Sequence, residues 1–276
     1  MKLWILLGLL LPFGVFAQLT YEKNWTTALE KAKAKNQLIF IKYYNENCSV
    51  CKKTQEILNT PEVAKAYQNN FVCYAINTEK KKPEEETLLQ KIGLEFDGVP
   101  IFIFVDANQQ WVHHSGVKAT KERLLQISSE ASNPNVQSSK YQDRYQKGER
   151  NVTLLFQYAE VLKAQKNYEK LKIVTSELYQ YFPKQNLSSN DSYFILKRVV
   201  TDTENGFFQY WYQNQKLLEG KETGVLVGKE KENLEKIVLQ EIRVFDKSKF
   251  TTEKKKKLMD IIQKLGITNQ PEVFFE

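Results

Sequence analysis

Cysteine and histidine are scarce in this chain, whose 276 residues include three cysteines, all before residue 74, and two histidines. So few thiols exclude a scaffold stapled by several disulfides, of the kind that small exported proteins use. The adjacent His113 and His114 would point to opposite faces of a strand, so they cannot both join two cysteines around zinc, and we predict no metal site. We expect both histidines to lie at the surface or in a hairpin.

The chain also lacks a basic motif interleaved with aromatic residues, although its formal net charge is +7. Its lysines are spread over helical faces and short runs such as 254–257, which is typical of solvated surfaces, and we therefore expect no nucleic-acid partner. With 42% hydrophobic and 26% charged residues, the chain can bury a sizeable core and has the length of about two domains.

A long apolar run is missing as well. The apolar stretch 3–11 is shorter than the ~20 residues that a membrane-spanning helix needs. It follows Met1 and Lys2, and a short segment ending in Ala17 comes after it, which is the pattern of a signal peptide. We predict that residues 1–17 are a signal peptide cleaved after Ala17, that the mature protein is periplasmic or secreted, and that it has no stable membrane insertion.

What the chain does contain is a C-x-x-C pair. Cys48 and Cys51 follow the apolar run 38–41, a predicted buried strand, and directly precede a predicted helix. At a helix start the first sulfur meets unpaired backbone N–H groups and the positive end of the helix dipole, which favour thiolate over thiol. Cys51 lies one turn further on, close enough to resolve a mixed disulfide. The alternative is a degenerate pair that folds but does little chemistry.

The third cysteine, Cys73, stands in the middle of another apolar run. We interpret it as a small buried apolar residue, with a third redox thiol or an intermolecular link as the alternative.

The elements predicted up to residue 130 follow the order helix, strand, helix, strand, helix, strand, strand, helix. Helices are expected at 24–36, from Thr60 and Pro61 onward, at 87–92 and from Thr120 onward, and strands at 38–43, 71–76, 101–105 and 111–114. Short connections through helices imply parallel strands, and the hairpin turn at 106–109 adds antiparallel pairing, so the sheet is predicted to be mixed.

Three features in this order carry a resemblance: an aromatic-rich strand, C-x-x-C-K, and Gly98-Val99-Pro100 before the third strand. Residues from about 20 to 130 resemble a thioredoxin fold, most closely the exported thioredoxin-like domains of bacterial thiol-disulfide interchange proteins. The resemblance implies that Cys48 is the nucleophile, that Cys51 is the resolving cysteine, and that Val99 and the cis-proline Pro100 bind substrate. It implies no cofactor, and partners that are protein thiols or disulfides together with an unidentified redox partner.

Four positions depart from the family's pattern, and we expect them to modulate the site. Asn47 stands in place of the tryptophan before the first cysteine, and Ser49 and Val50 stand in place of Gly-Pro. Lys42 occupies the position where many relatives keep a buried aspartate. If Lys42 points inward, it favours the thiolate and a more oxidising disulfide; if it reaches solvent at a sheet edge, it does neither. The redox direction therefore stays open between reductase, oxidase and isomerase.

Beyond a linker predicted at 132–139 the apolar spacing is helical throughout. The predicted organisation is a thioredoxin-like α/β domain at 18–131 and an all-α domain at 140–276. The first two helical stripes, 155–162 and 171–178, resemble a tetratricopeptide-type hairpin, without a consensus repeat at its period.

These patterns predict an exported thiol-disulfide oxidoreductase, whose helical domain chooses substrate, partner or oligomeric state. The alternative is a non-catalytic binding or assembly protein, in which the thioredoxin fold is a scaffold and the helical domain binds the partner.

Overall fold

The computed structural model describes residues 18–222 and 228–276 and divides the chain into two compact units. The first unit comprises the described residues up to 92 together with 97–137, and the second comprises 93–96 together with 138–276. The predicted signal peptide, residues 1–17, lies outside the described residues. Within the described residues, no helix is long and apolar enough to cross a membrane.

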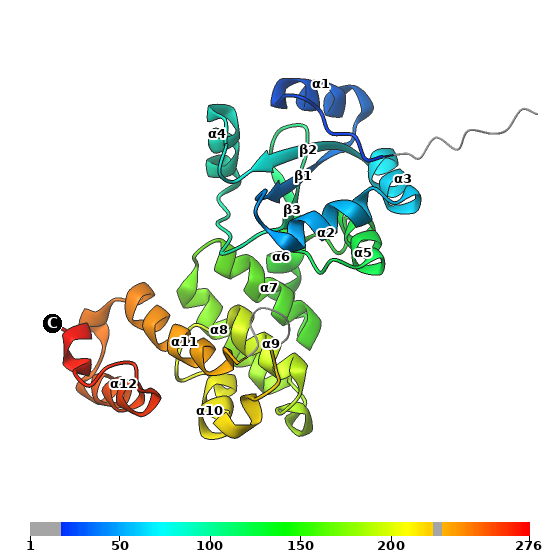
Figure 1. Cartoon of the computed structure of the whole chain (residues 1–276). Coiled ribbons are helices and arrows are strands. Elements are labelled where there is room, and N and C mark those ends of the chain that lie inside the picture. The colour runs from blue at the N-terminus through cyan, green and yellow to red at the C-terminus, as the bar shows by residue number, and fades with distance from the viewer. Residues whose placement is uncertain (1–17, 223–227) are drawn as a thin grey trace, which may run out of the picture. The chain divides into compact units, whose positions relative to one another are not determined.

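The first unit is built on a four-stranded sheet in the order β2-β1-β3-β4. Figure 1 labels the first three of these strands, β2, β1 and β3. Central β1 pairs parallel with β2 and antiparallel with β3, and β4 pairs antiparallel with β3. The strands are β1 (Leu38–Tyr44), β2 (Phe71–Asn77), β3 (Ile101–Val105) and β4 (Trp111–Gly116). The helices are α1 (Trp25–Lys35), α2 (Ser49–Leu58), α3 (Pro61–Asn70), α4 (Pro83–Ile92) and α5 (Lys121–Ser132). The predicted mixed sheet with flanking helices, a thioredoxin fold, is confirmed.

Helices cover both faces of this sheet, which explains why its strands read as continuous apolar runs. On one face Phe40 and Phe102 pack with buried residues of α2, α3 and α5 in a single core. On the other face Trp25 of α1 meets the ring of Tyr74 edge-on at 5.4 Å, and the Tyr74 hydroxyl donates to Glu85 of α4 at 2.5 Å. Because β1 is buried on both sides, every side chain of its central part has to be accommodated within the protein.

Helix α4 begins four residues earlier than predicted. The sequence pattern predicts this helix at 87–92, after the charged run 80–86, yet α4 starts at Pro83. Proline is well suited to a first helical turn, and Glu84, Glu85 and Glu86 all lie in that turn, where the helix dipole favours negative charge. The predicted cap of α5 is confirmed, since the Thr120 side chain accepts from the Arg123 N–H at 3.3 Å.

The second unit is helical apart from its connecting segments, as predicted for the C-terminal domain (Figure 1). Its helices are α6 (Tyr141–Gln146), α7 (Val152–Ala164), α8 (Tyr168–Tyr181), α9 (Asn190–Val199), α10 (Gly206–Gln213), α11 (Glu230–Val244) and α12 (Thr252–Leu265). Short 3₁₀ turns lie at Ser138–Lys140, Lys184–Asn186, Gln215–Leu218, Lys247–Lys249 and Pro271–Phe274. Gly206 lets α10 approach α8 closely, because a Cβ there would collide with the ring of Tyr179.

The short segment Gly93–Phe96 belongs to the second unit, although it connects α4 to β3 of the first. Leu94 is buried, and the Glu95 N–H donates to the carbonyl oxygen of Ala164 at the end of α7, at 2.7 Å. The chain therefore passes from one unit to the other three times, at 92–93, 96–97 and 137–138.

Candidate active site

Cys48 lies at the junction between β1 and α2, as the sequence predicted. Its backbone is extended (φ −82°, ψ 114°), and it is the N-cap residue of α2. Its Sγ accepts a hydrogen bond from the Cys51 N–H at 3.1 Å, and the side chain is partly exposed. A backbone N–H directed at the sulfur stabilises negative charge on it, so the geometry suits a nucleophilic thiolate that solvent and substrate can reach.

Cys51 lies in the first turn of α2 and is buried, with 3% of its surface exposed. Burial raises the pKa of the Cys51 thiol to about 11, while the charge on Lys42 acts in the opposite direction. Both cysteines are free thiols in the structure. The pair is thus asymmetric, with an accessible first sulfur and a protected second one.

The Val99–Pro100 peptide bond is cis, the isomer that the resemblance implied. The Cys48 thiol donates to the carbonyl oxygen of Val99, with Sγ and O 3.7 Å apart. Pro100 is buried and Val99 is half-buried, so this loop presents backbone to the first sulfur. The four predicted attack, resolution and substrate-binding residues, Cys48, Cys51, Val99 and Pro100, are therefore neighbours in space.

Three of the predicted modulating residues lie around the accessible sulfur. Asn47 and Ser49, on either side of Cys48 in sequence, are exposed. Val50 is also exposed, with 44% of its surface accessible, which adds an apolar side chain to the surface between the two cysteines. A partner that reaches Cys48 from solvent would meet this Val50 surface.

Lys42, the fourth predicted modulating residue, points inward from the central strand β1. Only 6% of its surface is exposed, so the alternative of a lysine reaching solvent at a sheet edge is wrong. Its Nζ donates to Oε1 of Gln55, and it stands 4.2 Å from the ring centroid of Tyr44 and 5.3 Å from that of Tyr21. Burial lowers the pKa of Lys42 to about 8, and the negative charge available at Cys51 opposes that shift.

Sequence reasoning missed two residues of this site, Gln55 and Tyr21. Gln55 accepts hydrogen bonds from Lys42 and from the Tyr21 hydroxyl, the latter at 3.1 Å. Its spacing gave a usable signal, because a residue four positions after Cys51 on a helix shares its face. Tyr21 precedes α1 and carries no comparable signal, since only the tertiary fold brings it to Gln55.

The other candidate residues lie away from redox chemistry. Cys73 is buried in β2, and burial raises the pKa of its thiol to about 12. Both histidines lie on β4, the returning strand of the hairpin with β3, as expected; His113 is buried there, and burial lowers its pKa to about 3. The strand alternation turns one of two adjacent residues toward the core, and α5 covers that face. Within residues 18–222 and 228–276, no group of three or more His, Cys, Asp or Glu side chains could hold a metal.

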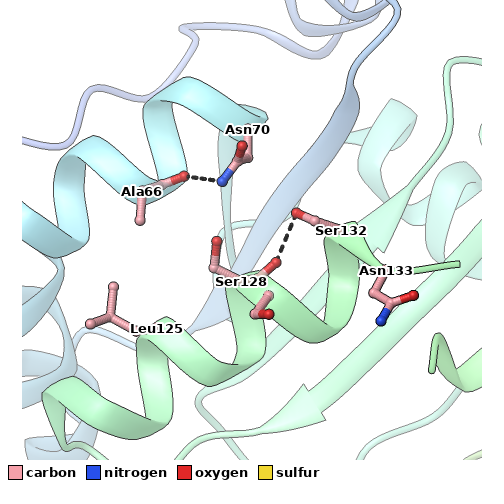
Figure 2. Close-up of a pocket in the computed structure, with 7 residues that line it drawn as sticks. Ala66, Asn70, Leu125, Ser128, Ser132 and Asn133 are labelled. Atoms are coloured by element: carbon pink, nitrogen blue, oxygen red, sulfur yellow. Dashed lines mark hydrogen bonds between the residues drawn. The ribbon is translucent and has the colours of Figure 1, made fainter. Parts of the chain in front are cut away.

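A pocket lies between α3 and α5, and Figure 2 shows its lining. It measures about 460 Å³ and is lined by Ala66, Asn70, Leu125, Ser128, Ser129, Ser132 and Asn133. Two of its polar side chains bond to their own helices: the Asn70 amide donates to the Ala66 carbonyl, and the Ser132 hydroxyl donates to the Ser128 carbonyl, both at 2.9 Å. None of the three cysteines borders the pocket, so it is not part of the site around Cys48.

Comparison with known proteins agrees with the fold of the first unit. Residues 25–131 match the sequence profile of a family described as a thioredoxin-like domain. Thioredoxin H4 of Arabidopsis thaliana is 29% identical over 102 residues, which are 36% of this chain and 76% of that protein. A crystal structure described as disulphide isomerase from Xylella fastidiosa Temecula1 covers 42% of this chain and 98% of that one, at 12% identity and a TM-score of 0.34. A likeness that weak carries no argument about this chain's activity.

Proposed function

Residues 25–131 form a thioredoxin-like domain, and on this premise we propose that the protein is a thiol-disulfide oxidoreductase that exchanges disulfides with protein substrates. One observation carries the proposal: a partly exposed Cys48, held as the N-cap of α2 by the Cys51 N–H, faces the cis-proline loop and has a buried thiol one turn behind it. A purely structural cysteine pair has no need for this asymmetry.

The proposed reaction has two steps. The Cys48 thiolate attacks one sulfur of a substrate disulfide, so a Cys48–substrate disulfide forms, the substrate disulfide breaks, and the released substrate thiolate takes up a proton. Cys51 then attacks the Cys48 sulfur, the Cys48–Cys51 disulfide forms, and the second substrate thiol leaves with the proton from Cys51. Two electrons pass from the cysteine pair to the substrate, and the reverse sequence oxidises a substrate dithiol.

The backbone of the cis-proline loop supports a role in substrate binding. The carbonyl of Val99 lies beside Cys48, where an extended substrate segment could pair with it by main-chain hydrogen bonds. Val50 would contribute an apolar contact at the same opening.

Export belongs to the same proposal. The signal-like pattern of residues 1–17 supports an exported protein, in a periplasmic or extracellular compartment where disulfides persist. No cofactor is required, because the electrons come from or go to the thiols of another protein. The helical unit is proposed to select the substrate or the redox partner.

The test compares the mature protein with three single substitutions in a disulfide-reduction assay driven by dithiothreitol. Cys48→Ser is expected to lower turnover to background, because the attacking sulfur is gone. Cys51→Ser is expected to trap substrate as a mixed disulfide visible on non-reducing gels, whereas Cys73→Ser should turn over like the wild type. Wild-type activity at background, or activity that survives Cys48→Ser, would contradict the proposal and favour the scaffold alternative.

A further inference from the structure

A buried amine lies on the same side of the sheet as the second redox thiol. Lys42 sits on β1 two residues after Phe40, on the face covered by α2, α3 and α5. Its register partners on the neighbouring strands, Ala75 and Phe102, carry no charge. An ammonium at such a position has lost its hydration, so it interacts strongly with any negative charge that forms nearby.

The groups that hold Lys42 are neutral. Its Nζ donates to the Gln55 amide and lies over the rings of Tyr21 and Tyr44, and among the described residues it forms no ion pair with a carboxylate. Burial raises the pKa of both tyrosines, so their hydroxyls stay protonated near neutral pH. The interacting group that can turn negative is the Cys51 sulfur.

We propose that Lys42 is a positioning residue for the resolving step: its ammonium stabilises the Cys51 thiolate as it forms and thereby speeds release of the substrate. This inference rests on the proposed function. Gln55 assists, because it is on the face of α2 that carries Cys51 and it fixes the amine there.

The charge balance of the resolving step explains why the amine acts there. Cys51 loses its proton as it attacks the Cys48 sulfur, and that proton leaves on the second substrate thiol. Negative charge exists on Cys51 only between these events, when the ammonium gains an anionic partner. Cys51 is a neutral thiol before the attack and part of a neutral disulfide afterwards, so Lys42 lowers the barrier of the resolving step and leaves the balance between the reduced and the oxidised pair nearly unchanged.

The effect of the Lys42 ammonium on Cys51 depends on pH through the titratable groups around it. Tyr21 comes from the segment before α1, Tyr44 from β1 itself, Cys51 from α2, and Cys73 from β2. The phenols and Cys73 remain neutral at pH 7 to 8 because burial raises the pKa of each. Cys48, which also acts on the Cys51 thiol, carries no charge while it is bound to substrate in the mixed disulfide. At the resolving step Lys42 is therefore the charged side chain that acts on Cys51, whose pKa burial raises.

The experiment uses the reduced mature protein and the aryl disulfide dithiobis(nitrobenzoate), which releases one coloured thiolate when Cys48 attacks and a second when Cys51 resolves the adduct. Lys42→Met is compared with the wild type and with Lys53→Met, a matched loss of one exposed lysine on α2. The first release should stay within about twofold in all three proteins. The second should slow about tenfold in Lys42→Met alone, and its pH at half-maximal rate should rise by about one unit.

A redox titration in glutathione buffers provides the second readout. The thiol–disulfide equilibrium constant of Lys42→Met at pH 7 should stay within about twofold of the wild type, because Cys51 is uncharged in both the reduced and the oxidised pair. Lys42→Arg, which keeps the charge, should recover part of the second release rate. An unchanged first release in Lys42→Met shows that this variant is folded.

The outcomes separate this inference from the proposed function. If the wild type gives both releases but Lys42→Met matches Lys53→Met in the rate of the second release and in its pH profile, the role of Lys42 is wrong while the oxidoreductase stands. If the wild type gives no second release that Cys51→Ser removes, the proposed function falls, and the inference falls with it.

Discussion

Each unit of the protein buries a charged side chain, and the two sites differ in what surrounds the charge. Lys42 in the first unit is held by the Gln55 amide and two tyrosine rings. Asp202 in the second unit is fully buried, and neither of its carboxylate oxygens accepts a hydrogen bond from a described residue. Its nearest cation, the Nζ of Lys172, is 4.0 Å away, and burial raises the pKa of Asp202 to about 6.

A second buried carboxylate near Asp202, that of Glu241, has both a hydrogen bond and an ion pair. Glu241 on α11, 1% exposed, accepts the Thr203 N–H at 2.8 Å and pairs with Lys254 of α12 at 2.6 Å. That pair fixes two helices and a connecting segment, which is a structural role. Lys42 differs because its electrostatic partner is a sulfur whose charge changes during a reaction. Burial of a charge alone therefore does not indicate function; a neighbour that changes its charge does.

The largest loss of stability is expected from breaking the ion pair between Glu241 and Lys254. Glu241→Leu removes the acceptor of the Thr203 N–H and the nearest partner of Lys254, which keeps Glu204 at 3.5 Å and the Thr203 hydroxyl at 3.2 Å. We therefore expect a cost of about 3 kcal/mol, the low end for loss of one partner of a buried ion pair. Hydrogen exchange followed by mass spectrometry should show this loss in α11 and α12, with the potential of Cys48–Cys51 unchanged. Glu241→Gln, which keeps an acceptor, is the control. Equal protection in Glu241→Leu and wild type would contradict the structural role.

Next in size is Lys42→Met, which should stabilise the first unit while impairing its chemistry. The folded pKa of Lys42, about 8, is below its ordinary 10.5, so its stabilising contribution is present above pH 10.5 and is lost as pH falls through 8. At pH 7 the wild type carries the whole cost of burying the Lys42 ammonium. At 1.36 kcal/mol per pKa unit, Lys42→Met should raise the free energy of unfolding by about 2–3 kcal/mol. Urea unfolding at pH 7 and pH 10 measures this gain. A gain that does not shrink at the higher pH would show that the ammonium is not its source.

Asp202→Asn should give a smaller gain with the opposite pH dependence. Since the folded pKa, about 6, is above the ordinary 3.8, the stabilising contribution of Asp202 is present below pH 3.8 and is lost as pH rises through 6. The amide removes the buried charge but brings two donors, so we expect a net gain of about 1–2 kcal/mol at pH 7.5. Thermal unfolding at pH 7.5 and pH 4.5 tests this, and a gain of equal size at both values would contradict it.

Tyr21→Phe should have the smallest effect and refines the comparison. It removes one hydrogen bond to Gln55, at a cost of about 1 kcal/mol, while the charge of Lys42 stays in place. The second release from the aryl disulfide should remain within about twofold of the wild type. A tenfold slowing would mean that the hydroxyl, and not the ammonium, controls Cys51.

Much of the first unit could be predicted because its signals are local. An apolar run followed by C-x-x-C and a helical pattern sufficed to put Cys48 at a helix start, and the Thr120 cap was read correctly. The start of α4 was missed because a charged run resembles a loop, although its acidic residues stabilise a first turn. Whether the Lys42 side chain is buried depends on whether β1 is a central or an edge strand. The sequence of the strand does not show this, because it is set by the order of strands in the whole sheet.

The rest of the architecture depends on long-range contacts that leave no local trace. Glu241 reaches Thr203 across 38 positions, and no spacing rule relates them. The predicted linker and the domain boundaries rested on composition, which is blind to the inclusion of Gly93–Phe96 in the second unit.

That inclusion has a consequence for how the protein can be divided. Because the chain passes between the units three times, no single cut yields both of them whole. A fragment ending at residue 137 would keep Gly93–Phe96 but lose Ala164, which leaves the Glu95 N–H without its acceptor. The two units therefore have to be kept together in any fusion or truncation. Removing the helical unit also removes a hydrogen bond of the segment Gly93–Phe96, which leads directly into the cis-proline loop.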